Sequence, residues 1–225
     1  MRINADFSLP VVILPEEYRW VDSPMPGVER MMLDRIGDEV ARATSLVRYA
    51  PNSSFSPHVH SGGEEFFVLK GEFGDEHQSY PAGSYVRNPI GTSHTPRVGN
   101  AGCTILVKLH QFDPGDSTPV FIDTLDGKWI VDYAPGLDVM LLHKFQDENV
   151  VLIRWAPNTP FKEHTHHGGE EVFVLEGRFS DDDGDYPAGS WLRLPDQSSH
   201  SAHTGNEGAL LFVKAGHLPT ASYAK

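Results

Sequence analysis

Residues 48–69 read Arg-Tyr-Ala-Pro-Asn-Ser-Ser-Phe-Ser-Pro-His-Val-His-Ser-Gly-Gly-Glu-Glu-Phe-Phe-Val-Leu, and this stretch decides the fold because it occurs twice. Residues 154–175 read Arg-Trp-Ala-Pro-Asn-Thr-Pro-Phe-Lys-Glu-His-Thr-His-His-Gly-Gly-Glu-Glu-Val-Phe-Val-Leu, at an offset of 106 residues without a gap. The register continues through Tyr-Pro-Ala-Gly-Ser at residues 80–84 and 186–190. Chance does not produce such a match, so the chain contains an internal duplication with a unit of roughly a hundred residues, in the usual range for one domain.

The apolar segments of each copy are short and rich in β-branched or aromatic residues, as at residues 65–69 and 104–108, with Gly, Pro, Asn or Asp between them. No stretch carries a helical stripe. Many short strands at close spacing predict an all-β sandwich or barrel. We expect two domains, residues 1–113 and residues 114–225, the second of which begins with a connecting segment that has the composition of a further strand at residues 120–122.

Two histidines in each copy are spaced for chelation. Side chains on a β-strand alternate between faces, so His58 and His60 point the same way. The Gly-Gly pair that follows permits a tight turn or bulge that can re-aim the next carboxylate toward them. Only one member of the Glu64-Glu65 pair can face inward, and His94 follows a Pro-containing turn as a further candidate ligand.

These residues resemble the two cupin motifs: His-x-His, three residues, Glu, six residues, Gly, and then Gly, five residues, Pro-x-Gly-x-x-His. Both copies match, except that Gln197 replaces a glycine of the second motif, and Val98 and Thr204 stand where an Asn often closes it. The Gly-Gly-Glu-Glu and Tyr-Pro-Ala-Gly-Ser sequences are similar to those in the cupin half of the zinc-binding anti-sigma factor ChrR.

The resemblance implies a bicupin, that is, two tandem cupin domains, each a double-stranded β-helix or jelly-roll barrel with one divalent metal ion inside. Its spacing selects the first Glu of each Glu-Glu pair. The implied metal ligands, four for each of two metal ions per chain, are His58, His60, Glu64 and His94, and His164, His166, Glu170 and His200.

Three nitrogen ligands and one oxygen suit zinc, iron(II), manganese, nickel or cobalt, and the lack of sulfur argues against copper(I) and iron–sulfur centres. A tetrahedral zinc would be closed by four ligands. An octahedral iron or manganese would leave two positions for a substrate and dioxygen. The ligand list is therefore compatible with either a regulator or an enzyme.

Three functions fit a metal-binding bicupin. The first is a metal-dependent small-molecule enzyme of the dioxygenase type, in which the metal binds and polarises the substrate. The alternative is a ChrR-like anti-sigma factor or a regulatory cupin that senses a metal or an oxidant. A sugar-binding or nucleotide-sugar-binding isomerase ranks lowest because nothing marks a phosphate cradle.

The anti-sigma family carries a helical zinc-binding domain, built with Cys and His, ahead of its cupin. This chain begins its first cupin unit within roughly twenty residues and has no cysteine before Cys103. We therefore expect that a sigma factor is not a partner of this chain.

Composition excludes other classes of partner. The formal net charge of −13 would repel nucleic acid. A single cysteine forbids an internal disulfide and is typical of a reducing, cytoplasmic location. The N-terminal apolar run is too short for a signal peptide and no run is long enough for a membrane span, so we expect no membrane contact and leave a homodimer open.

We expect the two sites to differ. On regular strands after the third histidine, Pro96 and Val98 would line the first pocket, and Ala202 and Thr204 the second. Smaller and more polar residues predict that the second pocket is roomier, more polar and the better place for chemistry, and that the first is more closed. Four arginines recur at the same offset and either pair with acidic neighbours or bind substrate: Arg48, Arg87, Arg154 and Arg193.

Overall fold

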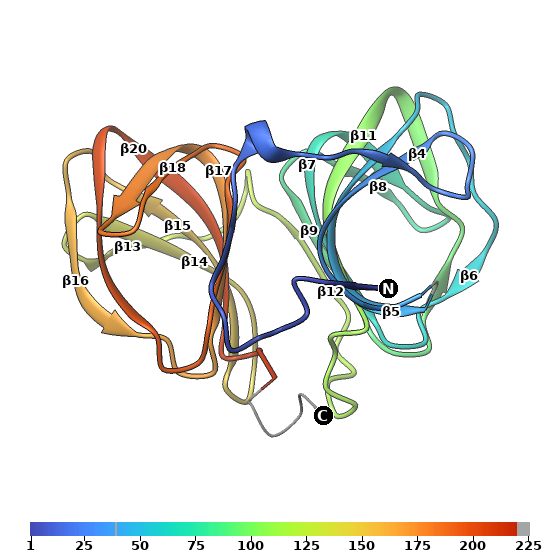
Figure 1. Cartoon of the computed structure of the whole chain (residues 1–225). Coiled ribbons are helices and arrows are strands. Elements are labelled where there is room, and N and C mark those ends of the chain that lie inside the picture. The colour runs from blue at the N-terminus through green and yellow to red at the C-terminus, as the bar shows by residue number, and fades with distance from the viewer. Residues whose placement is uncertain (39, 220–225) are drawn as a thin grey trace. The chain divides into compact units, whose positions relative to one another are not determined.

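The computed structural model describes residues 1–38 and 40–219, and in this part of the chain the regular structure is β-strand apart from one 3-10 turn, η1 (Pro15–Glu17). The predicted all-β class is confirmed, and the strands form two tandem jelly-roll barrels (Figure 1). The described residues form two compact units: the first lies within residues 1–5 and 19–127, and the second within residues 6–18 and 128–219. Within the described residues no helix is long and apolar enough to cross a membrane.

The first unit has a sheet with the strand order β1-β4-β5-β11-β7-β9-β12, in which β3 pairs with β4 and β8 with β7, and a separate pair β10-β6. These strand pairs are antiparallel. Its strands are β1 (Arg2–Ile3), β3 (Val21–Asp22), β4 (Val28–Gly37), β5 (Ala41–Tyr49), β6 (His58–Val59), β7 (Glu64–Gly74), β8 (Ser79–Pro81), β9 (Ser84–Asn88), β10 (Ser93–His94), β11 (Arg97–Leu109) and β12 (Val120–Asp123).

The second unit repeats this topology with the order β13-β14-β15-β20-β17-β19-β2, in which β16 pairs with β20 and β18 with β17. The long last strand of this unit, β20, corresponds to two separate strands of the first unit, because it pairs with both β16 and β15. Its strands are β2 (Val11–Ile13), β13 (Ile130–Ala134), β14 (Leu137–Phe145), β15 (Glu148–Trp155), β16 (Pro160–Thr165), β17 (Glu170–Asp181), β18 (Asp185–Pro187), β19 (Trp191–Leu194) and β20 (Ser199–Ala215).

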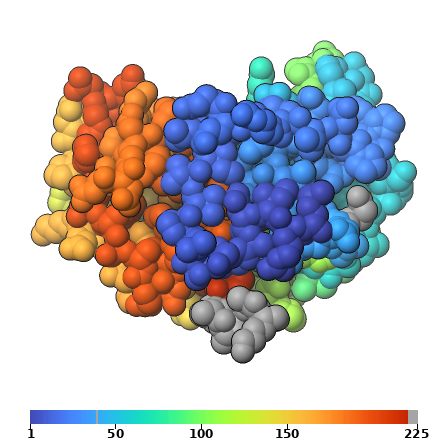
Figure 2. All heavy atoms as spheres, in the orientation of Figure 1, coloured from blue at the N-terminus to red at the C-terminus, as the bar shows by residue number. Residues whose placement is uncertain are grey.

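The last strand of each sheet comes from outside the repeated unit, and only that of the first sheet, at residues 120–123, was expected from the sequence. In the first unit β12, from the connecting segment, pairs with β9, with Val120 opposite Arg87. In the second unit the same position is taken by β2, near the N-terminus, with Val11 opposite Arg193. Figures 1 and 2 show this early blue segment against the orange strands of the second unit. The compact units are therefore not two continuous halves of the chain.

Buried arginines fasten these segments to their sheets. Arg87 binds Glu65 at 3.0 Å and Asp116 at 2.6 Å, and its guanidinium lies 4.2 Å from the ring centroid of Phe112. In the second unit Arg193 donates to the carbonyl oxygen of Asp6, and Phe7 covers its guanidinium. Of the two roles open to the recurring arginines, these two therefore take the structural one.

Each barrel encloses one apolar core formed by the inward residues of its alternating strands. In β7 these residues include Phe66 and Val68, and the ring of Phe66 packs edge-on against Phe73 and Tyr80 at centroid separations of 5.2 and 5.7 Å. Burial of each such aromatic ring contributes about 1.5–3 kcal/mol. The second core is built around Trp155, so both barrels have rigid walls for a site.

Candidate metal centres

The first predicted ligand set comes together at one place in the first barrel. His58 lies in β6 opposite His94 in β10, Glu64 begins β7, and His60 stands in the turn between β6 and β7. That turn needs a glycine at residue 63, where φ is +78° and a Cβ atom would lie 2.3 Å from the ring of Phe112. The double glycine of the repeat thus returns the chain so that Glu64 faces the histidines.

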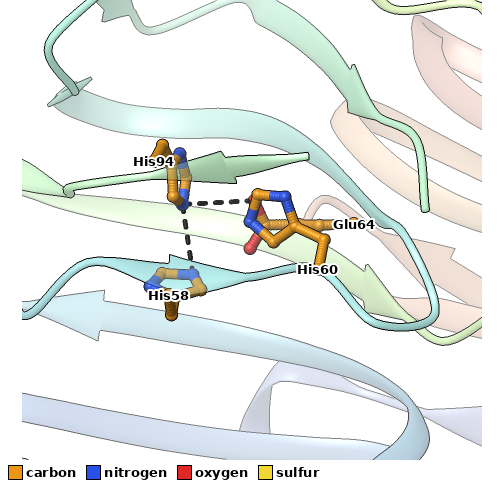
Figure 3. Close-up of side chains that lie close together, drawn as sticks. All are labelled: His58, His60, Glu64 and His94. Atoms are coloured by element: carbon orange, nitrogen blue, oxygen red, sulfur yellow. Dashed lines mark hydrogen bonds and ion pairs between the residues drawn. The ribbon is translucent and has the colours of Figure 1, made fainter. Parts of the chain in front are cut away.

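The four side chains of this set point toward one another (Figure 3). Nε2 of His94 lies 3.2 Å from Nε2 of His58 and 3.6 Å from Oε2 of Glu64. Nε2 of His60 lies 3.3 Å from the same carboxylate oxygen. All four candidate donor atoms fall within 4.8 Å of one another, a separation that one metal ion can bridge.

The second predicted set is gathered in the same way in the second barrel. His164 in β16 stands opposite His200 in β20, and Glu170 begins β17. Nε2 of His166 lies 3.2 Å from Nε2 of His164 and 3.7 Å from Oε1 of Glu170. The four donor atoms again lie within 4.8 Å of one another.

Hydroxyl groups orient one imidazole in each set. Thr92 donates its hydroxyl hydrogen to the carbonyl of Pro89 at 2.7 Å, so its oxygen accepts from Nδ1 of His60 at 2.9 Å. Ser198 holds His166 in the same way, at 2.9 Å. With the hydrogen assigned to Nδ1, Nε2 of each imidazole carries a lone pair directed into the cluster.

Carboxylate or carbonyl oxygens lie beside Nδ1 of the other four imidazoles. Nδ1 of His200 lies 2.8 Å from Oδ2 of Asp181, and Nδ1 of His94 lies 3.4 Å from Oδ2 of Asp75. Nδ1 of His58 and of His164 face backbone carbonyl oxygens two residues earlier, at 3.4 and 3.2 Å. The acceptors of His58, His164 and His200 require hydrogen on Nδ1, which leaves Nε2 of each as a lone-pair donor, whereas Nδ1 of His94 makes no hydrogen bond within the described residues.

These orienting residues were missed in the sequence although a signal was present. Asp75 and Asp181 stand at the offset of the repeat, as do Tyr80 and Tyr186, whose hydroxyls donate to them at 3.0 and 2.8 Å. Asn88 was missed too; its amide donates to Oε2 of Glu64 at 3.1 Å, whereas leucine takes that place in the second copy.

Burial shifts the proton affinities of the histidines and glutamates in opposite directions. Burial, followed by the charges of the neighbouring histidines, lowers the pKa of His60 to about 3 and that of His166 to about 4. Burial raises the pKa of Glu64 and of Glu170 to about 7. At neutral pH these two imidazoles are therefore neutral, the form that binds metal.

The residues present fit a divalent cation. Nε2 of His60 is buried and makes no hydrogen bond within the described residues, and Nε2 of His58 and Nε2 of His94 lie 3.2 Å apart. Such an arrangement is unfavourable unless a cation lies between the donors. Imidazole nitrogen and carboxylate oxygen are ligands that zinc, iron, manganese and nickel accept.

Each cluster borders a cavity, and the cavities differ in the direction opposite to our expectation. The first, about 270 Å³, is lined by His58, His60 and Glu64 together with the side chains of Arg30 and Arg35. The second, about 230 Å³, is smaller and, apart from its ligands, lined mainly by apolar residues. The prediction of a roomier and more polar second pocket is therefore wrong.

The physical reason lies in strands that the prediction did not consider. Pro96 and Ala202 do line the cavities, but Val98 is in the apolar core, and Thr204 turns its hydroxyl to the carbonyl of Ala156. Polarity is set instead by β4 and β14, which supply arginine to the first cavity and Val139 to the second.

A family model described as the ChrR cupin-like domain matches residues 9–113 and again residues 117–219. The chain belongs to the ChrR cupin-like family. The family model matches twice, and the two matched copies of the domain cover nearly the whole of this ChrR cupin-like chain, which agrees with the internal duplication. No curated protein matches the sequence.

Solved structures share the two-barrel fold at low sequence identity. A proposed dioxygenase from Nostoc punctiforme superposes with a TM-score of 0.72 at 19% identity, over 98% of this chain and 84% of that one. The Ylba protein of E. coli gives 0.70 at 15%, over 96% and 94%. A variant of oxalate decarboxylase from Bacillus subtilis gives 0.66 at 12%, over 93% and 78%. At these identities the likeness shows the cupin fold of this ChrR cupin-like protein.

Proposed function

We propose that this protein is a metal-dependent enzyme of the dioxygenase type that acts on a small molecule, with one divalent metal ion in each barrel. One observation carries the proposal. In each cluster three imidazoles and a carboxylate converge, and all the imidazoles except that of His94 have a hydrogen-bond partner on Nδ1. Such orientation by outer partners is characteristic of metal-binding histidines.

Eight residues would hold the metals. When bound, the metal would supply Lewis acidity and, if it is iron or manganese, one-electron chemistry that side chains lack. The protein's own part is to fix the donors, to exclude bulk water with the apolar walls and to leave room for a ligand in the cavity. The residues assigned to the first metal are His58, His60, Glu64 and His94, and those assigned to the second are His164, His166, Glu170 and His200.

The comparisons favour an enzyme with a small-molecule substrate. Two of the proteins similar in fold carry enzyme names, a proposed dioxygenase and an oxalate decarboxylase. Cavities of about 270 and 230 Å³ suit a compact ligand rather than a polymer.

The family description favours a second candidate, a regulatory barrel that senses an oxidant or a small ligand. Both candidates need the metal, and they differ in turnover. An enzyme consumes dioxygen in proportion to substrate, whereas a sensor changes state once and stops.

The test begins with the metal content of protein purified without a polyhistidine tag, which would bring nickel. We expect two ions per chain in the wild type and one in His60→Ala and in His166→Ala. Oxygen uptake by the iron(II)-loaded protein is then measured against a panel of small substrates. Full metal content in both variants would refute the assignment, and metal binding without catalytic oxygen uptake would favour the sensor.

A further inference from the structure

A cation faces the cavity of the first barrel, and the described residues that line the second cavity include no arginine or lysine. Arg30 lies in β4 opposite Val47, an inward residue of the first core, and its side chain lines the cavity that contains His58, His60 and Glu64. The equivalent residue of β14 stands opposite Ile153, at the offset of Val47, and is a valine. The two barrels therefore present different chemistry to a ligand.

The charge of Arg30 is not neutralised by the protein. Its guanidinium donates to the neutral hydroxyl oxygen of Ser23, and among the described residues no carboxylate forms an ion pair with it. Arg35 lines the same cavity, but it donates to the backbone carbonyl of Asp38 and its charge also interacts with the carboxylate of Asp38. A half-buried cation without an anionic partner favours binding of an anion.

The rest of the cavity restricts the kind of anion. Its volume of about 270 Å³ is at the small end for a ligand site. Apolar side chains form much of the remaining wall and would contact a short hydrocarbon chain: Val28, Val47, Phe55, Val107 and Leu109.

We propose that the first barrel binds a short-chain carboxylate, with Arg30 as the charge partner of its carboxylate group. The inference rests on the proposed function, since it places the substrate in the cavity beside the metal cluster. A planar guanidinium matches a carboxylate through two parallel hydrogen bonds. The second cavity, lined by Val139 and aromatic residues, takes an uncharged apolar ligand instead.

Calorimetric titration with butanoate and with its uncharged analogue butanamide tests the inference, in both the metal-loaded and the metal-free protein. We expect butanoate to bind roughly tenfold to a hundredfold more tightly than butanamide, the effect of one charge-assisted contact. Arg30→Gln abolishes this preference and Arg30→Lys keeps part of it. Arg48→Gln is the matched control, because Arg48 is exposed and its guanidinium stacks 3.6 Å from the ring centroid of Trp20. This control variant should keep the wild-type preference for butanoate over butanamide.

Equal affinities for butanoate and butanamide in the wild type would overturn the inference, whether or not any variant folds. Unchanged butanoate binding in a folded Arg30→Gln protein would overturn it as well. Tighter binding of inorganic phosphate than of butanoate would overturn the carboxylate assignment. Arg30-dependent butanoate binding without oxygen uptake would support this inference while refuting the dioxygenase proposal, so the two can fail separately.

Discussion

The Nδ1 atom of His200 lies 2.8 Å from Oδ2 of Asp181, and that carboxylate also accepts, through Oδ1, a hydrogen bond from the hydroxyl of Tyr186 at 2.8 Å. Burial alone would raise the pKa of Asp181, but the hydrogen bonds from His200 and Tyr186 outweigh burial and lower it. The carboxylate is therefore ionised at neutral pH and keeps hydrogen on Nδ1 of His200. Nε2 of this histidine is left free for a metal.

Asp181→Asn should weaken metal binding at the second site by roughly ten- to a hundredfold, because an amide can donate to Nδ1 and so favours the wrong tautomer. Competition with a chromophoric chelator measures the affinity. Asp182→Asn, at an exposed neighbouring position, serves as the control and should leave it unchanged. An unaltered affinity in Asp181→Asn would show that this contact does not orient the ligand.

Metal binding should release protons in a pH-dependent way. The pKa of Glu64 and of Glu170 is raised by burial to about 7, so at pH 6 both are mostly protonated in the metal-free protein and lose their protons to bind metal. At pH 8 they are already ionised. Apparent metal affinity should therefore rise with pH up to about 7 and level off above it.

Calorimetry in buffers of different ionisation enthalpy counts the protons released. We expect close to one per site at pH 6 and close to none at pH 8. Release that is equal at both values would contradict a raised glutamate pKa. His60 and His166 should not contribute at either pH, since burial lowers their pKa to about 3 and about 4.

The two glutamates of the first Glu-Glu pair should respond oppositely to substitution. Glu64→Gln should abolish or strongly weaken metal binding at the first site and leave the fold intact. Glu65→Gln should keep the metal but lower the free energy of unfolding by about 2 kcal/mol, because Glu65 is buried against Arg87 and Tyr85. Metal content and urea denaturation separate the two effects, and the reverse pattern would place the wrong carboxylate at the site.

Phe7→Ala should destabilise the second unit although residue 7 precedes the first cupin repeat. Phe7 is buried and covers the guanidinium of Arg193, and Phe→Ala at such a position costs about 3 kcal/mol. Hydrogen exchange should accelerate in β19 and not in β9. Phe112→Ala, which uncovers Arg87, is the matched variant, and in this variant hydrogen exchange should accelerate in β9 and not in β19. Faster exchange in β9 after Phe7→Ala would contradict the strand assignment.

The local sequence pattern was sufficient to predict the strands, and its match to the cupin motifs was sufficient to predict that the eight candidate ligands converge. A side chain's face on a strand follows from its position in an alternating pattern, and a double glycine marks a turn; both are local properties. That is why the placement of His58 beside His60 could be predicted, whereas the choice of Glu64 over Glu65 came from the resemblance to the cupin motifs. Their role as metal ligands stays a prediction.

Non-local contacts could not be predicted in this way. The pairing of β2 with β19 joins Val11 to Arg193 across most of the chain, and no local periodicity specifies which sheet edge a short strand will join. The prediction about the pockets failed for a related reason, since the cavity wall is completed by strands other than those that carry the ligands. Arg30 reaches the first cavity from β4, in a register interrupted by a bulge between Met32 and Asp34.

The sequence by itself therefore determined the duplication, the all-β class, the family and the eight residues that converge in two clusters, because each depends on short-range spacing repeated twice. Only the tertiary structure decided which segment completes each barrel, which partners fix the imidazole tautomers, and which barrel carries an arginine in its cavity. These features depend on hydrogen bonds and packing between strands distant in the chain, and the geometry of such contacts exists only once the barrels have closed.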